Sequence, residues 1–148
     1  MNLIVDANIL FSYFWNESTT KEIITKYKIN LYSPELAIKE IKKYSKEIQQ
    51  KTNISLQEFE EKLEELKQII NFIEEEKYIE TIKRIIKLIT NESTNEYKEF
   101  LEDIDFLGLA YQLNCPLWTN DKLLKKQNII EILTTKELIE LLPEIEKY

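Results

Sequence analysis

The stretch DIDFLGLAYQLNCPLWTNDK, residues 103–122, places a helical apolar pattern directly before a short apolar strand and an acid. The apolar side chains between residues 105 and 113 recur at helical spacing, which predicts a helix there. The run Pro116-Leu117-Trp118-Thr119 predicts a buried strand, and Asp121 follows it by two residues. Ligands of open parallel sheets bind beyond the carboxyl ends of the strands. Asp121 is therefore expected at a ligand-binding edge.

The N-terminus repeats this arrangement of strand and acid. Leu3-Ile4-Val5 is a short apolar run that ends at Asp6, and it predicts another buried strand. Because parallel strands end at the same edge, Asp6 and Asp121 are expected to lie there together. Asn8 either adds an amide to this site or caps the helix that follows.

The remaining chain alternates predicted strands and helices. A strand is predicted over residues 29–32 and another over 129–133, whereas residues 68–73 fit either a helix or a short strand. Helices are predicted over residues 9–15, from Thr19 to 27, from a Ser33 cap with Pro34 in the first turn to about 50, over 55–66, 75–89 and 105–113, and from a Thr134 cap to 142. The polar residues 90–96 predict a loop.

This alternation predicts an α/β protein in which helices cover both faces of a parallel sheet of about four to five strands. A single domain over residues 1–148 suits the length, and the charged residues near 50–67 suggest a variable helical hairpin. Gly108 is the only glycine, so the Gly-rich phosphate loops of dinucleotide and P-loop proteins are excluded.

Composition narrows the chemistry. The chain has no histidine, which excludes His-based triads and imidazole metal ligands. Its lone cysteine, Cys115, lies among apolar residues and is interpreted as a packed thiol. The net charge of −7 argues against a nonspecific nucleic-acid coat. No apolar run reaches the roughly 20 residues of a membrane span and no signal peptide is visible, so a cytoplasmic protein is expected.

Two further acids are predicted to point inward from helices. Glu40 lies on the flank of the apolar stripe formed by Ala37 and Ile41, and Asp103 aligns with Phe106 if its helix extends back that far. Asp105 would point the other way. Inward carboxylates repel one another strongly, and a divalent cation removes that repulsion. The sequence therefore predicts a site for Mg²⁺ or Mn²⁺ at Asp6, Glu40, Asp103 and Asp121.

Each acid also has an ordinary structural interpretation. Asp6 and either Asp103 or Asp105 are placed where they would cap a helix, and Asp121 is placed where it would stabilise a turn. Glu40 taken alone reads as a surface glutamate. The order and spacing of the four acids, rather than any one of them, indicate a site.

In that order and spacing the chain resembles the PIN-domain nucleases. The resemblance rests on Val5-Asp6-Ala7-Asn8, on Glu40 in an early helix, on Asp103 seven residues before Ala110, and on Thr119-Asn120-Asp121. It implies a three-layer α/β/α fold and a metal-dependent endoribonuclease. The implied catalytic and metal-binding residues are Asp6, Glu40, Asp103 and Asp121, with Asn8, Asp105, Thr119 and Asn120 as accessory residues and Lys39, Lys43 and Lys122 as RNA contacts.

Many proteins of this family are toxins of the VapC type, so an antitoxin partner and a homodimer are also implied. The alternative is a catalytically weak PIN-like module that binds RNA or protein, which the acidic charge favours. A phosphatase that uses Asp6 as its nucleophile ranks lower, because such enzymes usually carry a second Asp where this chain has Asn8.

Overall fold

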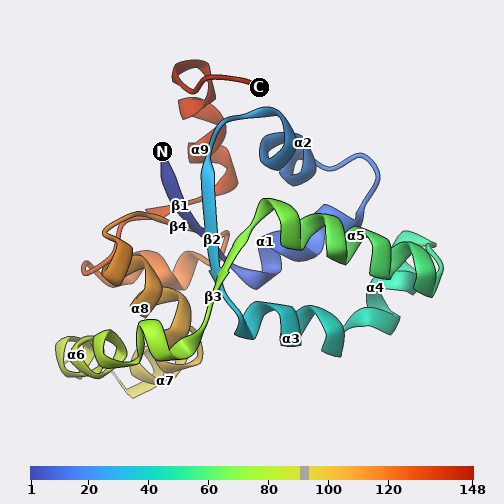
Figure 1. Ribbon diagram of the computed structural model, residues 1–148. Coiled ribbons are helices and arrows are strands. Elements are labelled where there is room, and N and C mark those ends of the chain that lie inside the picture. The colour runs from blue at the N-terminus through green and yellow to red at the C-terminus, as the bar shows by residue number, and fades with distance from the viewer. Residues whose placement is uncertain (91–93) are drawn as a thin grey trace.

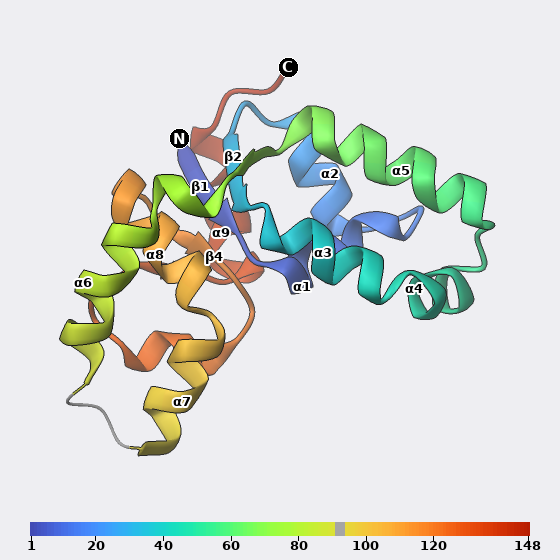
Figure 2. The same cartoon turned by 60° about the horizontal axis from the view of Figure 1, so that its bottom comes forward.

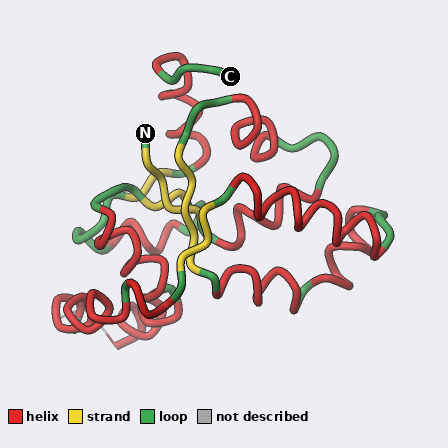
Figure 3. Tube along the Cα trace, viewed as in Figure 1, coloured by secondary structure: helices red, strands yellow, loops and turns green. Residues whose placement is uncertain are grey.

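A five-stranded parallel sheet has the strand order β3-β2-β1-β4-β5. Figure 3 shows the strands, in yellow, at the centre of the protein among the helices. The computed structural model describes residues 1–90 and 94–148. Every neighbouring pair of strands is parallel, which confirms the predicted α/β class. The strands are β1 (Asn2–Val5), β2 (Asn30–Pro34), β3 (Asn71–Ile73), β4 (Leu117–Trp118) and β5 (Ile132–Leu133).

Helices form a layer on each side of this sheet (Figure 1). Helices α6 (Ile79–Ile89), α7 (Thr94–Glu102) and α8 (Ile104–Leu113) lie on one side. The other side carries α1 (Ala7–Phe11), α2 (Thr19–Lys26), α3 (Leu36–Lys43), α4 (Ser45–Thr52) and α5 (Leu56–Ile69), while α9 (Thr135–Leu141) follows β5. The predicted three-layer α/β/α architecture is confirmed.

Local sequence signals explain where several helices begin. Ser55 and Glu58 form a complete capping box before α5, and Thr134 and Glu137 form another before α9, both as predicted. The expected box at Thr19 is wrong by one residue, because Ser18 caps α2 by accepting a hydrogen bond from the Lys21 N–H (3.0 Å).

The predicted helix from Ser33 to residue 50 is wrong in two respects. Ser33 and Pro34 belong to β2 rather than to a helix start, and the buried Ser33 hydroxyl donates to the Val5 carbonyl (2.9 Å). Pro34 is the last residue of the strand, where its missing N–H does not break the ladder. The helix is also interrupted at Tyr44, whose ψ of 16° separates α3 from α4.

The structure decides one ambiguous segment, residues 68–73, and corrects the predicted loop at residues 90–96. In the segment 68–73, α5 continues through Ile69 and residues 71–73 form β3 beside β2, so the helix interpretation holds for its start and the strand interpretation for its end. The expected loop at 90–96 is wrong for residues 94–96, which begin α7, and its residues 91–93 lie outside the described part of the chain. The buried Phe100 of α7 explains why this polar segment packs as a helix.

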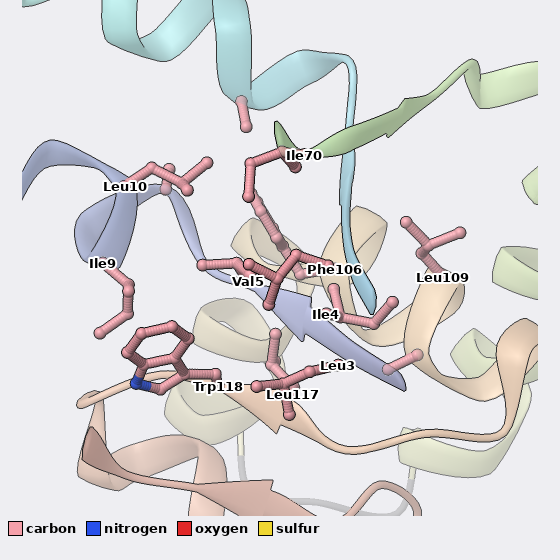
Figure 4. Close-up of a cluster of buried hydrophobic side chains, with 14 of the residues drawn as sticks. Leu3, Ile4, Val5, Ile9, Leu10, Ile70, Phe106, Leu109, Leu117 and Trp118 are labelled. Atoms are coloured by element: carbon pink, nitrogen blue, oxygen red, sulfur yellow. The ribbon is translucent and has the colours of Figure 1, made fainter. Parts of the chain in front are cut away.

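The core forms where the sheet meets its helices (Figure 4). β1 contributes Leu3, Ile4 and Val5, and each is fully buried. Gly108 brings α8 against α6, because a Cβ at this position would lie 2.8 Å from Ile82 Cγ1. This close approach fixes α8, the helix that begins next to Asp103.

The strand order changes direction at β1, which lies between β2 and β4. The crevice beyond the carboxyl ends of β1 and β4 is therefore the topological switch point at which open α/β sheets bind ligands. Asp6 and Thr119 directly follow these two strands. Among the described residues, no helix has both the length and the apolar character that crossing a membrane requires.

Candidate active site

Asp6 is the most buried of the predicted acids. It follows β1 at the start of α1, it is 5% exposed, and its backbone N–H continues the sheet by donating to the Trp118 carbonyl (3.0 Å). Its side chain makes no helix-capping hydrogen bond and instead accepts one from the Thr119 hydroxyl (2.6 Å). Burial raises the pKa of Asp6, and the Thr119 hydrogen bond partly opposes this rise.

Thr119 connects the ends of β1 and β4. Its fully buried hydroxyl donates to Asp6 and accepts from the backbone N–H of Asp121 (3.1 Å). Asp121 is exposed, and its carboxylate accepts from the Leu123 N–H (3.0 Å) at the start of a 3₁₀ helix, Lys122–Lys126. Asp121 thus does have the turn-stabilising contact that was its ordinary interpretation, and it also lies beside Asp6.

Asn120 is directed away from these acids. Its amide nitrogen donates to the Thr135 hydroxyl (3.0 Å), and its amide oxygen accepts from the Thr135 N–H (2.9 Å). The side chain therefore ties the end of β4 to the start of α9. Its role in this structure is to hold the Thr119–Asp121 turn in place.

Glu40 and Asp103 reach the same edge from helices on opposite sides of the sheet. Glu40 is half-buried on α3, one residue before the fully buried Ile41. Asp103 occupies the N-cap position of α8, but its side chain makes no capping hydrogen bond. Both carboxylates line a pocket of about 510 Å³, together with the exposed side chain of Asn8. Asn8 belongs to α1 and does not cap it.

The four acids share one electrostatic environment. The pKa of Asp103 is raised to about 7, first by burial and then by the negative charges of Asp6, Asp121 and Glu40 as well as Glu102. Burial also raises the pKa of Glu40, with further contributions from Asp6 and Asp105 and an opposing one from Lys43. The geometry agrees with this, because Thr119 joins Asp6 and Asp121 at the ends of the adjacent strands β1 and β4, and Glu40 and Asp103 line one pocket. The fold therefore brings Asp6, Glu40, Asp103 and Asp121 to one edge of the sheet.

The side chains nevertheless do not form a closed ligand cage. Within residues 1–90 and 94–148, no three acids approach closely enough to hold one ion between them. Mutual repulsion and existing hydrogen bonds explain this, since Thr119 holds Asp6 and the Leu123 N–H holds Asp121. The donor set itself, made of carboxylate oxygens without nitrogen or sulfur, fits a hard cation such as Mg²⁺ or Mn²⁺.

Asp105 lies on a different wall from Asp103. Its carboxylate accepts a hydrogen bond from the Tyr78 hydroxyl (2.9 Å), and it lines a separate pocket with Lys39 and Glu74. Burial, followed by this hydrogen bond, raises the pKa of Tyr78. Asp105 still acts on Glu40 through its charge, but Asp103 is the acid that shares the pocket with Glu40.

The three predicted RNA-contacting lysines are placed differently. Lys43 lines the Glu40–Asp103 pocket, with its Nζ 5.5 Å from the centre of the Tyr44 ring. Lys39 lines the Asp105 pocket instead, and the exposed Lys122 begins the turn after Asp121. Sequence reasoning missed the aromatic side chains of the Glu40–Asp103 pocket. Phe11, Trp15 and Tyr44 line it, and the exposed position of Trp15 was not visible in the helical pattern.

Comparison with known proteins identifies the family. The family model described as the PIN domain matches residues 4–143, which is nearly the whole chain. The chain therefore belongs to the PIN-domain family, a family of nucleases.

A solved structure supports the same fold. The chain is similar to a chain of VapBC2 from Rickettsia felis, whose crystal structure holds a DNA fragment from their promoter. The TM-score is 0.57 at 12% sequence identity, and the match covers 90% of this chain and 98% of the other. A search of curated proteins found no match.

Proposed function

We propose that this PIN-domain protein is an endoribonuclease that uses Mg²⁺ or Mn²⁺, held by Asp6, Glu40, Asp103 and Asp121, to hydrolyse phosphodiester bonds. The observation that supports it most directly is the placement of the four acids, since Thr119 joins Asp6 to Asp121 at adjacent strand ends and Glu40 and Asp103 line one pocket. In keeping with this placement, burial and the charges of the other acids raise the pKa of Asp103. Such mutual repulsion is relieved by a bound dication. Membership of a nuclease family supplies the class of reaction.

In this proposal each of the four acids has its own role in holding the metal ion. Asp6 is the anchoring ligand, because its burial and the Thr119 hydrogen bond fix its position. Glu40 and Asp103 complete the site from the helices, and Asp121 turns from its cap toward Asp6. When bound, the ion supplies Lewis acidity toward the phosphate and a water of lowered pKa for the attack.

The same residues explain how an acidic chain would hold a polyanion. Lys43 and Asn8 line the pocket that contains Glu40 and Asp103, so they would contact phosphate groups on either side of the scissile bond. The metal ion neutralises the carboxylates at the centre. Phosphate affinity would therefore depend on the divalent cation and fall with increasing salt.

The proposed partners rest on the structural likeness and on the family resemblance. VapBC2 is the protein of the similar structure, and this likeness supports an antitoxin as the partner of the present chain. A homodimer is proposed as its assembly from the resemblance to the family alone. Light scattering of the purified chain, alone and with the product of a neighbouring small gene, tests both. A monomer that forms no complex would contradict them without affecting the nuclease proposal.

The experiment is RNA cleavage with a matched pair of variants. Mixed single-stranded RNAs are incubated with wild-type protein and Mg²⁺, Mn²⁺ or chelator, and with the Asp6→Asn and Glu60→Gln variants. Glu60 is exposed on α5 and is not one of the acids of the candidate site, so Glu60→Gln is the control for the change of an acid to an amide. We expect cleavage by wild type and Glu60→Gln with metal only. Asp6→Asn should lose about three orders of magnitude of activity or more, because an anionic ligand is removed.

A catalytically weak binding module is the second candidate. The net charge of −7 and the failure of any three described acids to gather around one point favour it. Under this alternative, RNA or a protein partner binds without metal-dependent cleavage. Equal behaviour of wild-type and Asp6→Asn protein, with neither cutting RNA, would support the binding module and exclude the nuclease.

A further inference from the structure

The pocket beside the acidic site is walled by several parts of the chain. Its walls come from α1 and the residue after the 3₁₀ helix Ser12–Phe14, from α3 and α4, and from the junction of α7 and α8. Figure 2 shows α1 and α3 converging at this end of the sheet. Glu40 and Asp103 line the pocket, so it opens directly onto the proposed site of hydrolysis. Its volume of about 510 Å³ is typical of pockets that bind small organic groups.

Aromatic side chains are exposed here, although the largest fully buried side chains of the core are also aromatic. Trp118, Tyr13, Tyr78, Phe14 and Phe100 are all fully buried or nearly so. Trp15 is 37% exposed and Tyr44 is 41% exposed, and both line the pocket. Tyr44 is held in position by an edge-on contact with Phe11, with 5.7 Å between the ring centres.

The charges in the pocket distinguish among ligands. Lys43 lies over the Tyr44 ring, whereas Lys51 is already paired with Glu47 (2.7 Å). Acids outnumber bases on the remaining wall, which holds Glu40, Glu102 and Asp103 but only Lys43 as a base, and Glu102 offers an acceptor. A phosphate would be repelled from that wall, but a nucleobase is neutral, stacks on aromatic rings and presents N–H donors to carboxylates.

We propose that this pocket binds an unpaired nucleobase next to the scissile phosphate, with Trp15 and Tyr44 as its stacking surfaces. The inference rests on the proposed function and deepens it, because it names the side chains of this chain that would hold a base of the substrate beside the site of hydrolysis. In a duplex both faces of each base are occupied by neighbouring bases, so no ring is free to stack between protein side chains. Lys43, beside Tyr44, contacts the phosphate attached to the bound nucleoside.

The first test measures binding without cleavage. A single-stranded adenosine hexamer, or a hairpin of paired bases, is titrated into the Asp6→Asn variant with Mg²⁺, and tryptophan fluorescence is followed. The chain has two tryptophans. Trp118 is fully buried and its Nε1 donates to Thr135, so it supplies a constant signal, whereas Trp15 is exposed. We expect the hexamer to quench Trp15 emission, the hairpin to leave it unchanged, and Trp15→Phe to abolish the quenching.

The second test measures cleavage of a single-stranded RNA by active protein. Loss of one stacking surface typically weakens nucleic-acid binding by about 5- to 150-fold, so Trp15→Ala and Tyr44→Ala should each raise KM within that range. Trp15→Phe keeps an aromatic face and should stay within about threefold of wild type. Tyr111→Ala is the control, since Tyr111 is 41% exposed on α8 and lines a different pocket. Thermal unfolding verifies that each variant is folded.

The outcomes separate this inference from the function on which it rests. If wild-type protein cuts no RNA with any metal but the hexamer still quenches Trp15, the pocket stands and the nuclease proposal fails. If RNA is cut and both alanine variants keep the wild-type KM, the pocket proposal fails alone. Absence of quenching by the hexamer, or equal quenching by the hairpin, also overturns it, and would leave a protein partner as the ligand to test.

Discussion

The two halves of the candidate site are built in different ways. At the ends of β1 and β4, Asp6 is buried and joined to Asp121 through the hydroxyl of Thr119. At the helix side, the carboxylates of Glu40 and Asp103 accept no hydrogen bond from any residue the structure describes. The strand half is therefore fixed by hydrogen bonds. The helix half is held in place by packing alone and carries unresolved repulsion.

This difference indicates how the site would work. The sheet fixes the position of Asp6, the proposed anchoring ligand, because the hydrogen-bonded strand ends leave its side chain little freedom. The pKa values of Glu40 and Asp103 are raised, as is that of Asp6, but these two carboxylates lack such hydrogen bonds and would be free to adapt to a dication. Changes to the strand half should consequently damage both stability and activity, whereas changes to the helix half should stabilise the protein and damage activity only.

The largest effect on stability is expected at Thr119, and it is accompanied by a loss of activity. Thr119→Val keeps the shape of the side chain but removes the donor to Asp6 and the acceptor for the Asp121 N–H. Cleavage should fall by about 10- to 100-fold, as is usual when a partner of a metal ligand is lost. Chemical denaturation should show a loss of about 1–3 kcal/mol, because buried polar groups are left unpaired.

Thr119→Ser is the matched control for that change. It retains the hydroxyl and should keep most of the activity, with a smaller loss of stability from the missing methyl group. If valine and serine behaved alike in both assays, the strand half would not depend on this hydrogen bond.

The next effect has the opposite sign and concerns Asp103. Its pKa in the folded protein, about 7, exceeds the ordinary value of 3.8, so between these pH values the folded state binds more protons than the unfolded state. Without metal, stability should therefore decrease as the pH rises from about 4 through about 7. Asp103→Asn should raise the unfolding free energy at pH 8 by about 1–2 kcal/mol, part of the full shift because the side chain is partly exposed.

Denaturation of wild type and Asp103→Asn in chelator across pH 5 to 8 checks this prediction. The two curves should diverge as the pH rises, with the variant more stable at the alkaline end. If the unfolding free energies of the two proteins changed in parallel with pH, Asp103 would not be the group whose charge destabilises the folded protein. Asp105→Asn would then be the variant to compare.

The smallest effect separates the lysines of the two pockets. Lys43→Ala should raise the KM for RNA by about two- to fivefold at low salt, which is the range of an exposed charge contact. Lys39→Ala should leave KM unchanged, because Lys39 lines the pocket of Asp105 and Glu74. Steady-state cleavage at two salt concentrations distinguishes them, and a larger effect of Lys39 would move the RNA path to the other side of α3.

The strand half of the site could be predicted from the sequence more accurately than the helix half. β1 and β4 are apolar strands that are followed directly by the polar residues Asp6 and Thr119. Because the two strands are parallel neighbours, these residues lie at the same edge of the sheet. The prediction of a helix start at Ser33-Pro34 was wrong because it relied on a local signal. Pairing of β2 with β3 instead extends the strand through Pro34. Tertiary pairing outweighed local propensity there.

The pocket could not be predicted because no local pattern encodes it. Tyr44 fits the apolar stripe of a continuous helix, and only the break between α3 and α4 exposes it at 41%. Helix α7, in contrast, had a signal that was overlooked, since Tyr97, Phe100 and Leu101 recur at helical spacing within polar sequence. The hydrogen bond by which Asp121 caps the 3₁₀ helix Lys122–Lys126 could not be predicted, because no apolar periodicity in the sequence indicates that short helix.

If the four carboxylates of both halves together hold a divalent cation at one site, Mn²⁺ should stabilise the folded protein, and this stabilisation tests the proposal most directly. Thermal unfolding of wild type should shift upward with Mn²⁺, corresponding to about 2.7 kcal/mol at a hundredfold excess over Kd. The variants Asp6→Asn, Glu40→Gln, Asp103→Asn and Asp121→Asn should each lose most of this shift, while Asp105→Asn keeps it. A wild-type protein that does not respond to Mn²⁺, or four variants that respond as fully as wild type, would contradict the account.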